Sequence, residues 1–234
     1  MPKPARPTSE SQEDYLKALY GLGAGAGSVP NSAVAQELGV SPASVSEMLG
    51  KLASRELVTH DHYHGARLTK SGAEIALEMV RHHRLLETYL VKALGYSWDE
   101  VHAEADRLEH AISEVLEERM WEALGRPAFD PHGHPIPAPD GTVTDSPVGP
   151  LHLSAEGTEV VVSRISDRDP EKLRAIERLG ILPGTAARVA RASQWEGPIQ
   201  LAVDGVPVEV PLGLARSVFV EDSSSLQSEA SRLG

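Results

Sequence analysis

Two imidazoles and two carboxylates recur in one stretch of the chain, and together they could bind a metal ion. His102, Asp106, Glu109 and His110 stand at i, i+4, i+7 and i+8. A continuous helix would carry all four within about 100° of one face. An apolar stripe beside them predicts that this face borders a buried seam. Because burying unpaired carboxylates is costly, a divalent cation is the simplest compensation.

A second pair, His83 and Glu87, stands at i, i+4 in the preceding helical stretch. Cysteine is absent, so nitrogen and oxygen must hold any metal, which suits Mn2+ or Fe2+ and does not exclude Zn2+. A solvated acidic and histidine face is one alternative. A di-iron enzyme is another, but such bundles use Glu-x-x-His motifs, whereas Glu109 and His110 are adjacent. We therefore expect a protein that is not an enzyme.

The composition of the 234 residues leaves room for two or three domains. Residues 1–70 contain equal numbers of acidic and basic groups, so the net charge of −12 comes from residues 71–234. A neutral N-terminal module can still meet DNA phosphate on an otherwise acidic protein. No apolar run approaches the ~20 residues of a membrane span, and no signal peptide is visible. We therefore expect a cytoplasmic protein with no membrane partner.

The elements that would position these ligands begin with a winged helix-turn-helix. Helices are predicted over 9–22, 32–39 and 41–55, followed by two short strands over 57–60 and 66–69. A recognition helix places its N-terminal residues in the major groove. We predict that the third helix contacts DNA, although an interaction module that never touches DNA is the alternative. The predicted contact residues are Ser41, Pro42, Ala43, Ser44, Ser46, Lys51 and Arg67.

Two longer helices are predicted next, over 71–94 and from Ser97 or Asp99 to about Leu124. Apolar residues in the C-terminal half of the second helix predict a homodimer, since two-fold dimers are the commonest assembly. A dimer of winged helices fits a palindromic double-stranded operator with half-sites about 34 Å apart.

The remaining residues contain first a proline- and glycine-rich stretch and then a series of predicted strands. Residues 126–150 are rich in proline and glycine and predict a linker. Five short strands predicted after Leu151 suggest a small SH3-like barrel, with Asp204-Gly205 as a hairpin turn. The predicted fold class is therefore mainly α with a small β domain. The expected parts are a winged helix-turn-helix over 1–72, a helical metal-binding and dimerisation domain with linker over 73–150, an SH3-like domain over 151–222 and a polar tail over 223–234.

Several motifs in this order resemble one family of regulators. They are Glu13-Asp14-Tyr15-Leu16, Val40-Ser41-Pro42-Ala43-Ser44-Val45-Ser46, His83-Arg84-Leu85-Leu86-Glu87, His102-x3-Asp106-x2-Glu109-His110 and Gly133-His134-Pro135-Ile136-Pro137. From about residue 9 to 222 the chain resembles the three-domain diphtheria-toxin-repressor and manganese-transport-regulator class. The resemblance implies a regulator of metal-homeostasis genes in which metal is the corepressor that fixes the dimer for operator binding. A winged-helix regulator that responds to another signal is the alternative.

The resemblance also implies two metal sites. In the first, a metal ties the first helix to the dimerisation helix through Asp14, Asp106, Glu109 and His110. Iron-sensing members carry Met and Cys at the Asp14 and Asp106 positions. The carboxylates in this chain are harder ligands, so Mn2+ is the expected cofactor and Fe2+ the alternative.

The second implied site uses the His83, Glu87 and His102 positions. Its remaining ligand comes from the SH3-like domain in some members and from the linker in streptococcal-type members. The candidates are Asp169 first, with Asp167 and Glu171 as rivals, and Asp130 and His132 in the linker.

Overall fold

The computed structural model describes residues 8–23, 27–61, 64–144, 147–192 and 197–223. The chain forms two compact units. The first unit comprises residues 1–83, 107–122 and 137–143, and the second comprises residues 84–106, 123–136 and 144–234. Among the described helices, none combines the length and the apolar character needed to cross a bilayer.

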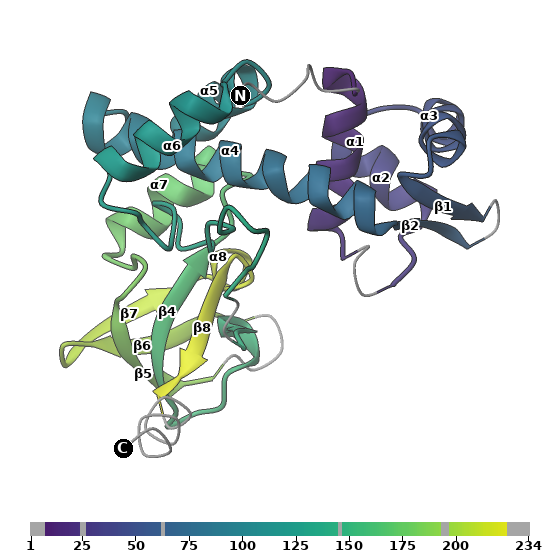
Figure 1. Ribbon diagram of the computed structural model, residues 1–234. Helices are drawn as coiled ribbons and strands as arrows, with labels where there is room; N and C mark the ends of the chain where they lie inside the picture. The colour runs from purple at the N-terminus through teal and green to yellow at the C-terminus, as the bar shows by residue number, and fades with distance from the viewer. Residues whose placement is uncertain (1–7, 24–26, 62–63, 145–146, 193–196, 224–234) are drawn as a thin grey trace, which may run out of the picture. The chain divides into compact units, whose positions relative to one another are not determined.

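The first unit contains the predicted winged helix-turn-helix (Figure 1). Ser9 is the N-cap of its first helix, and Gly39 ends the second in the left-handed conformation with φ of 64°. Ser41 accepts a hydrogen bond from the Ser44 backbone N–H at 3.1 Å, so it caps the third helix at the predicted start of this element. The elements are α1 (Glu10–Gly21), α2 (Asn31–Leu38), α3 (Pro42–Ser54), β1 (Val58–Asp61) and β2 (Gly65–Leu68).

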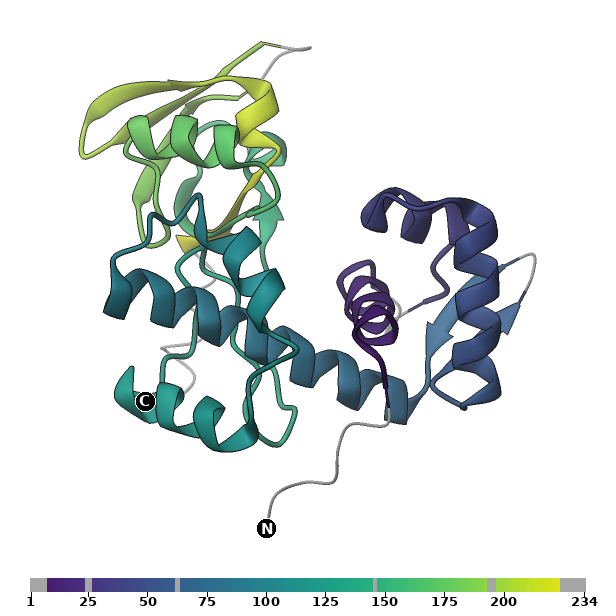
Figure 2. The same ribbon diagram turned by 90° about the horizontal axis from the view of Figure 1, so that it is seen from above.

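One apolar core joins these elements. Leu16 and Leu19 of α1 are fully buried together with Val45 and Leu49 of α3. Figure 2 shows α1 (purple) nearly end-on, with α2 and α3 (indigo to blue) beside it. Because the core includes both α1 and α3, a displacement of α1 is transmitted to α3 by packing.

Helix α4 (Lys70–Leu94) follows the wing, and the predicted long helix after it is interrupted. The prediction of one helix to Leu124 is wrong: α5 (Val101–Leu108) ends before Glu109, and α6 (Glu114–Ala123) begins after Ser113. The carbonyl oxygen of Glu109 lies 3.1 Å from His82 Nδ1, and the Ser113 hydroxyl accepts from the Leu116 N–H at 3.3 Å. These contacts end one helix and cap the next, so Glu109 and His110 lie in a turn and not on the helical face of His102.

A buried charged network holds α6 to α4 in the first unit. Arg81 Nε donates to Glu117, and His82 Nε2 lies 2.9 Å from the other Glu117 oxygen. The Arg81 guanidinium also stacks over Trp121, 4.7 Å from the ring centroid. Burial alone would raise the pKa of the Glu117 carboxyl, but hydrogen bonds from His82 and Arg81 lower it below its ordinary value.

The second unit contains a six-stranded antiparallel sheet in the order β3-β8-β4-β5-β6-β7. The predicted SH3-like strands are present, with β3 as an additional short strand, and no pairing among the described residues closes the sheet into a barrel. Pro207 lies on β7 at the sheet edge, where a residue without a backbone N–H is tolerated. The strands are β3 (Gly149–Pro150), β4 (Glu159–Ile165), β5 (Ala186–Arg191), β6 (Ile199–Val203), β7 (Val206–Val210) and β8 (Val218–Asp222).

Helices complete the core of this sheet. Leu173 and Ile176 of α7 (Pro170–Arg178) are fully buried against the strands, with α7 at one end of the sheet (Figures 1 and 2). A single 3-10 turn (Leu151–Leu153) and α8 (Leu212–Ala215) supply Leu151 and Ala215 to the same core. Arg174 of α7 donates to Asp99 at 2.7 Å. Because Asp99 lies just before α5, this contact joins α7 to the start of α5.

We predict that Glu117→Ala destabilises the protein by about 3–5 kcal/mol, because Arg81 and His82 would remain buried without their shared carboxylate. Urea unfolding of the metal-free protein measures this. Glu118→Ala, at an exposed position on the same helix, is the control and should change stability by less than about 0.5 kcal/mol. Equal effects of the two substitutions would show that the network adds no stability.

Candidate metal centre

The first cluster of possible ligands lies in the first unit. Asp14, Glu109 and His110 each offer an atom within 4.8 Å of the others. Asp14 projects from α1, and the other two come from the turn after α5. His110 Nε2 lies 3.0 Å from Asp14 Oδ1 and 3.6 Å from Glu109 Oε1. Asp14 of α1 and Glu109 of the turn after α5 therefore both approach the Nε2 edge of the His110 ring.

Glu13 is a neighbour that the sequence reasoning missed as a functional residue. Its buried carboxylate lies 2.8 Å from His110 Nδ1. A carboxylate on the second ring nitrogen fixes the orientation of the imidazole and increases its basicity, as in many metal sites. Burial opposes protonation of His110, but Glu13, Asp14 and Glu109 outweigh it and raise its pKa. Burial raises the pKa of Asp14, an effect that His110 partly offsets.

Glu109 is almost completely buried, with 1% of its surface exposed. Lys17 Nζ donates to both of its oxygens, at 2.9 and 2.7 Å. His83 Nδ1 lies 2.6 Å from Glu109 Oε2 and 3.0 Å from Lys17 Nζ. The buried carboxylate is thus compensated by nitrogen groups from α1 and α4.

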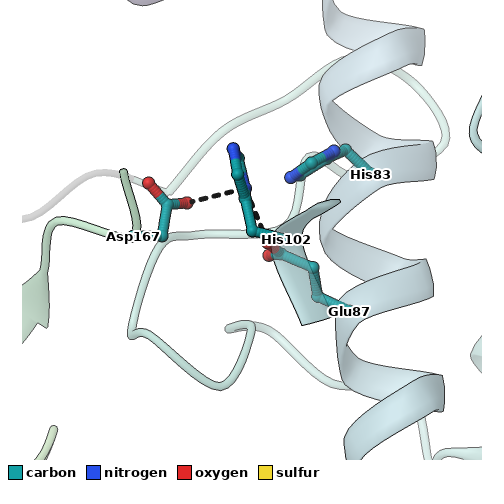
Figure 3. A group of neighbouring side chains, drawn as sticks. All are labelled: His83, Glu87, His102 and Asp167. Carbon is teal, nitrogen blue, oxygen red and sulfur yellow. Dashed lines mark hydrogen bonds and ion pairs between the residues drawn. The ribbon is translucent and has the colours of Figure 1, made fainter. Parts of the chain in front are cut away.

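The second cluster lies in the second unit, around Glu87 of α4. His102 Nδ1 is 3.1 Å from Glu87 Oε1 and 3.8 Å from Asp167 Oδ2 (Figure 3). His83 precedes Glu87 by one turn of the same helix, and Figure 3 shows its ring on the same side. Within the second unit, His102 therefore lies between Glu87 and a carboxylate that follows β4.

A turn in the proline-rich linker brings further ligand atoms to Glu87. Asp130 Oδ1 accepts from the backbone N–H groups of His132 and His134, at 2.8 and 2.9 Å. His132 Nε2 lies 2.7 Å from the Trp98 carbonyl oxygen, which can only accept, so Nε2 carries the proton. The other nitrogen, Nδ1, faces Glu87 Oε2 at 3.6 Å.

Gly133 allows this turn to lie against the sheet. Its φ is +87°, and an added Cβ would lie 2.0 Å from the Ser163 carbonyl oxygen of β4. The His132 carbonyl in turn accepts from the Ile165 N–H at 2.9 Å. The sequence marks this position only as one glycine in a proline-rich stretch, so the close approach to β4 was not predictable.

The donors of the linker turn fit a divalent cation. Asp130, His132 and His134 each offer a ligand atom within 4.8 Å of the others. Asp130 Oδ2, His132 Nδ1 and His134 Nδ1 are buried without a hydrogen-bond partner among the described residues. Burial opposes the charged form of His132, but Glu87, Asp130 and Asp167 outweigh it and raise its pKa to about 9. This strongly negative environment favours a positive charge, and the oxygen and nitrogen donors suit Mn2+ or Fe2+.

The candidate carboxylates for the second site, Asp167 and Asp169, have different surroundings in the structure. Asp167 approaches His102 and also lies 3.8 Å from His134. Asp169 instead caps α7, with Oδ1 accepting from the Glu171 and Lys172 N–H groups. Asp106 is half exposed, 3.6 Å from His102 Nε2, and belongs to the second unit.

The predicted DNA-contact residues lie on or near the recognition helix in the first unit. Ser46 is partly buried and its hydroxyl accepts from Asn31 Nδ2 at 3.1 Å. Lys51 forms a 2.7 Å ion pair with Glu47, one turn earlier on the exposed face. The exposed members of the predicted set are Ser41, Pro42, Ala43, Ser44, Lys51 and Arg67.

Family comparisons match three successive parts of the chain. Residues 7–66 match the iron dependent repressor N-terminal DNA binding domain, and residues 69–138 match the iron dependent repressor metal binding and dimerisation domain. Residues 150–222 match the FeoA domain.

Individual relatives give the same result. The HTH-type transcriptional regulator MntR of Bacillus subtilis is 33% identical over 106 residues, covering 45% of this chain and 74% of that protein. The iron-dependent repressor IdeR of Mycobacterium tuberculosis is 33% identical over 105 residues, covering 45% and 46%. A solved structure of a manganese-dependent transcriptional repressor in complex with manganese is 41% identical, with a TM-score of 0.84 and coverage of 90% of this chain and 99% of that one.

We predict that Gly133→Ala lowers the unfolding free energy by about 2 kcal/mol, because the left-handed backbone and the contact with Ser163 both exclude a side chain. Urea unfolding again measures the change. Gly149→Ala is the matched control, since its Cβ would meet nothing within 4 Å and its φ is not positive. A variant at Gly133 as stable as this control would contradict the tight packing of the linker turn on β4.

Proposed function

Since the chain belongs to the iron-dependent repressor family, we propose that it is a metal-dependent DNA-binding regulator of metal-homeostasis genes. The observation that carries this proposal is the convergence of Asp14, Glu109 and His110. Mn2+ is the proposed corepressor, with Fe2+ as the alternative, because the relatives include proteins named for each metal. As a DNA-binding regulator it would act in the cytoplasm.

The first proposed metal site consists of Asp14, Glu109 and His110, with Asp106 as the further ligand expected from the family resemblance. The 3.0 Å approach of His110 to Asp14 supports the first three. Glu13 would act on the far ring nitrogen, where its carboxylate holds the imidazole in place. When bound, a divalent cation would supply a positive charge near three carboxylates, those of Glu13, Asp14 and Glu109, and would take the His110 imidazole as a nitrogen ligand.

The second proposed site is centred on Glu87, whose two oxygens face different imidazoles. Oε1 is close to His102 and Oε2 is close to His132. Asp130 and Asp167 complete a set of carboxylates around these rings, and His83 lies one turn away on α4. We favour Asp167 over Asp169 and Glu171, because Asp169 already caps α7 through two backbone N–H groups.

The proposed switch depends on charge within the first site. Asp14 and Glu109 are like charges on two segments that must stay together for α1, and hence α3, to hold a fixed position. Their mutual repulsion favours separation, and His110 between them and the Lys17 ammonium on Glu109 offset this repulsion only in part. A coupling of 1–3 kcal/mol between metal and DNA would change DNA affinity by roughly 5–150-fold.

The proposed partners are a palindromic double-stranded DNA operator and a second copy of the chain. Leu108, Val115 and Leu116 are exposed at the end of α5 and on α6, in the segment that matches the dimerisation domain. A two-fold axis through this surface would present two recognition helices to successive major grooves. Ser41, Pro42, Ala43 and Ser44 at the start of α3 would then contact base edges and phosphates.

We predict that Asp14→Ala abolishes metal-dependent DNA binding and leaves the fold intact, since Asp14 is a half-exposed ligand and not a core residue. The measurement is fluorescence anisotropy with operator DNA selected from a random pool by wild-type protein and Mn2+. Wild-type binding should strengthen at least about tenfold with Mn2+, within the coupling range above, and the variant should show no such gain.

Glu10→Ala, an exposed acidic position on the same helix, is the control and should behave as wild type. Wild-type DNA binding that ignores both Mn2+ and chelator would contradict metal dependence and favour a regulator that responds to another signal. DNA binding that is lost equally in both variants would contradict the role given to Asp14.

We also predict that Glu87→Gln removes one bound Mn2+ per chain, because Glu87 joins both imidazoles of the second site. Equilibrium dialysis with elemental analysis gives the metal count. The isosteric amide keeps the packing at this fully buried position. His64→Ala, at an exposed wing position, should leave the count unchanged, and an unchanged count in Glu87→Gln would contradict the second site.

A further inference from the structure

Lys17 lies on α1 three residues after Asp14, so the two side chains share a face of the helix. Its ammonium contacts both oxygens of Glu109 and lies 3.0 Å from His83 Nδ1. The Lys17 side chain is 22% exposed, whereas Glu109 is 1% exposed. The contact is therefore a largely buried ion pair that joins α1 to the turn after α5.

Glu109 is also part of the proposed first metal site, where its Oε1 lies 3.6 Å from His110 Nε2. The same oxygen, Oε1, also accepts from the Lys17 ammonium at 2.9 Å, so one carboxylate contacts both the ammonium and the cluster of Asp14 and His110. A carboxylate oxygen that accepts hydrogen bonds from an ammonium is a weaker electron donor to a metal. A positive charge a few ångströms from a divalent cation also repels it, and burial limits solvent screening.

We propose that Lys17 is a built-in counter-cation that competes with divalent metal for Glu109. In the metal-free chain it holds α1 to the turn after α5 and so stabilises the fold. At the same time it lowers the affinity of the first site and sets the metal concentration at which the site fills. This inference rests on the proposed first metal site and adds to it a residue that opposes loading.

A purely structural ion pair predicts a different result. If Lys17 only orients Glu109, removing it leaves a misplaced ligand and metal binding weakens. If Lys17 competes with metal, removing it strengthens metal binding while the metal-free protein becomes less stable. The two effects have opposite signs, which distinguishes competition from simple loss of structure.

The test compares Lys17→Met, which keeps most of the aliphatic stem, with Lys17→Arg, which keeps the charge. Mn2+ affinity is measured on the full chain by the electron paramagnetic resonance signal of free Mn2+, in the Glu87→Gln background to remove the second proposed site. Thermal unfolding in chelator measures metal-free stability. Lys92→Met, near the end of α4, is the control for loss of a lysine charge elsewhere.

Lys17→Met is expected to bind Mn2+ about tenfold more tightly, on the scale of one nearby charge in a partly screened site. Its metal-free melting temperature is expected to fall by about 3 °C. Lys17→Arg and Lys92→Met should stay within about twofold of the parent. Adding Asp14→Ala to Lys17→Met should remove the gain, because the gain belongs to the site that contains Asp14.

Unchanged or weaker Mn2+ binding in Lys17→Met would overturn the inference, as would an equal gain in Lys92→Met. A gain that survives Asp14→Ala would also overturn it, since the affected ion would lie elsewhere. If the proposed first metal site itself were wrong, the result would be different: Asp14→Ala would not reduce Mn2+ binding by the parent Glu87→Gln protein.

Discussion

The burial of glutamate carboxylates is the constraint on which the rest of this structure depends. Glu87, Glu109 and Glu117 are all nearly inaccessible to solvent. A buried carboxylate is tolerated only with a positive or hydrogen-bonding partner, so each position determines what must surround it. Side chains from the helices and from the linker turn meet this requirement at Glu87, Glu109 and Glu117.

The three carboxylates have partners of different kinds. Glu117 has a guanidinium, which is charged at any physiological pH and keeps α6 on α4 permanently. Glu87 faces two imidazoles, which can be protonated or can bind a metal through a ring nitrogen. Glu109 is intermediate, with the Lys17 ammonium on both of its oxygens and His110 near one of them, Oε1. With the proposed metal sites, one protein would contain a structural ion pair at Glu117, an exchangeable cation at Glu87 and a competition between ammonium and metal at Glu109.

Local signals in the sequence predicted much of the fold. Ser9, Gly39 and Ser41 mark helix ends as expected, and Asp204-Gly205 forms its hairpin with both residues at positive φ. The types of metal donor also followed from the sequence, since the chain has no thiolate. These features depend on residues close together in the chain, which one sequence reveals directly.

Features that depend on distant partners were missed. The helix break before Glu109 requires His82 at its carbonyl, and the linker turn requires the backbone of β4. Our preference for Asp167 over Asp169 has a different basis, because the sequence contains a local signal for it. Asp169 precedes Pro170, a pairing typical of an N-cap followed by the first helical residue. This cap engages the Asp169 carboxylate and therefore favours Asp167 as the proposed ligand.

The metal sensitivity and the metal selectivity of such a site have different physical origins. An ammonium beside Glu109 repels every divalent ion through the same charge, so Lys17 shifts the affinity for all of them in the same direction. Discrimination among Mn2+, Fe2+ and Zn2+ must then come from ligand number and geometry, since imidazole and carboxylate donors alone favour the later metals. Glu13 contributes to that geometry by fixing the His110 ring, and the linker turn does so by fixing Asp130 and His132. The threshold for response can therefore be changed at Lys17 without rebuilding the ligand set that chooses the ion.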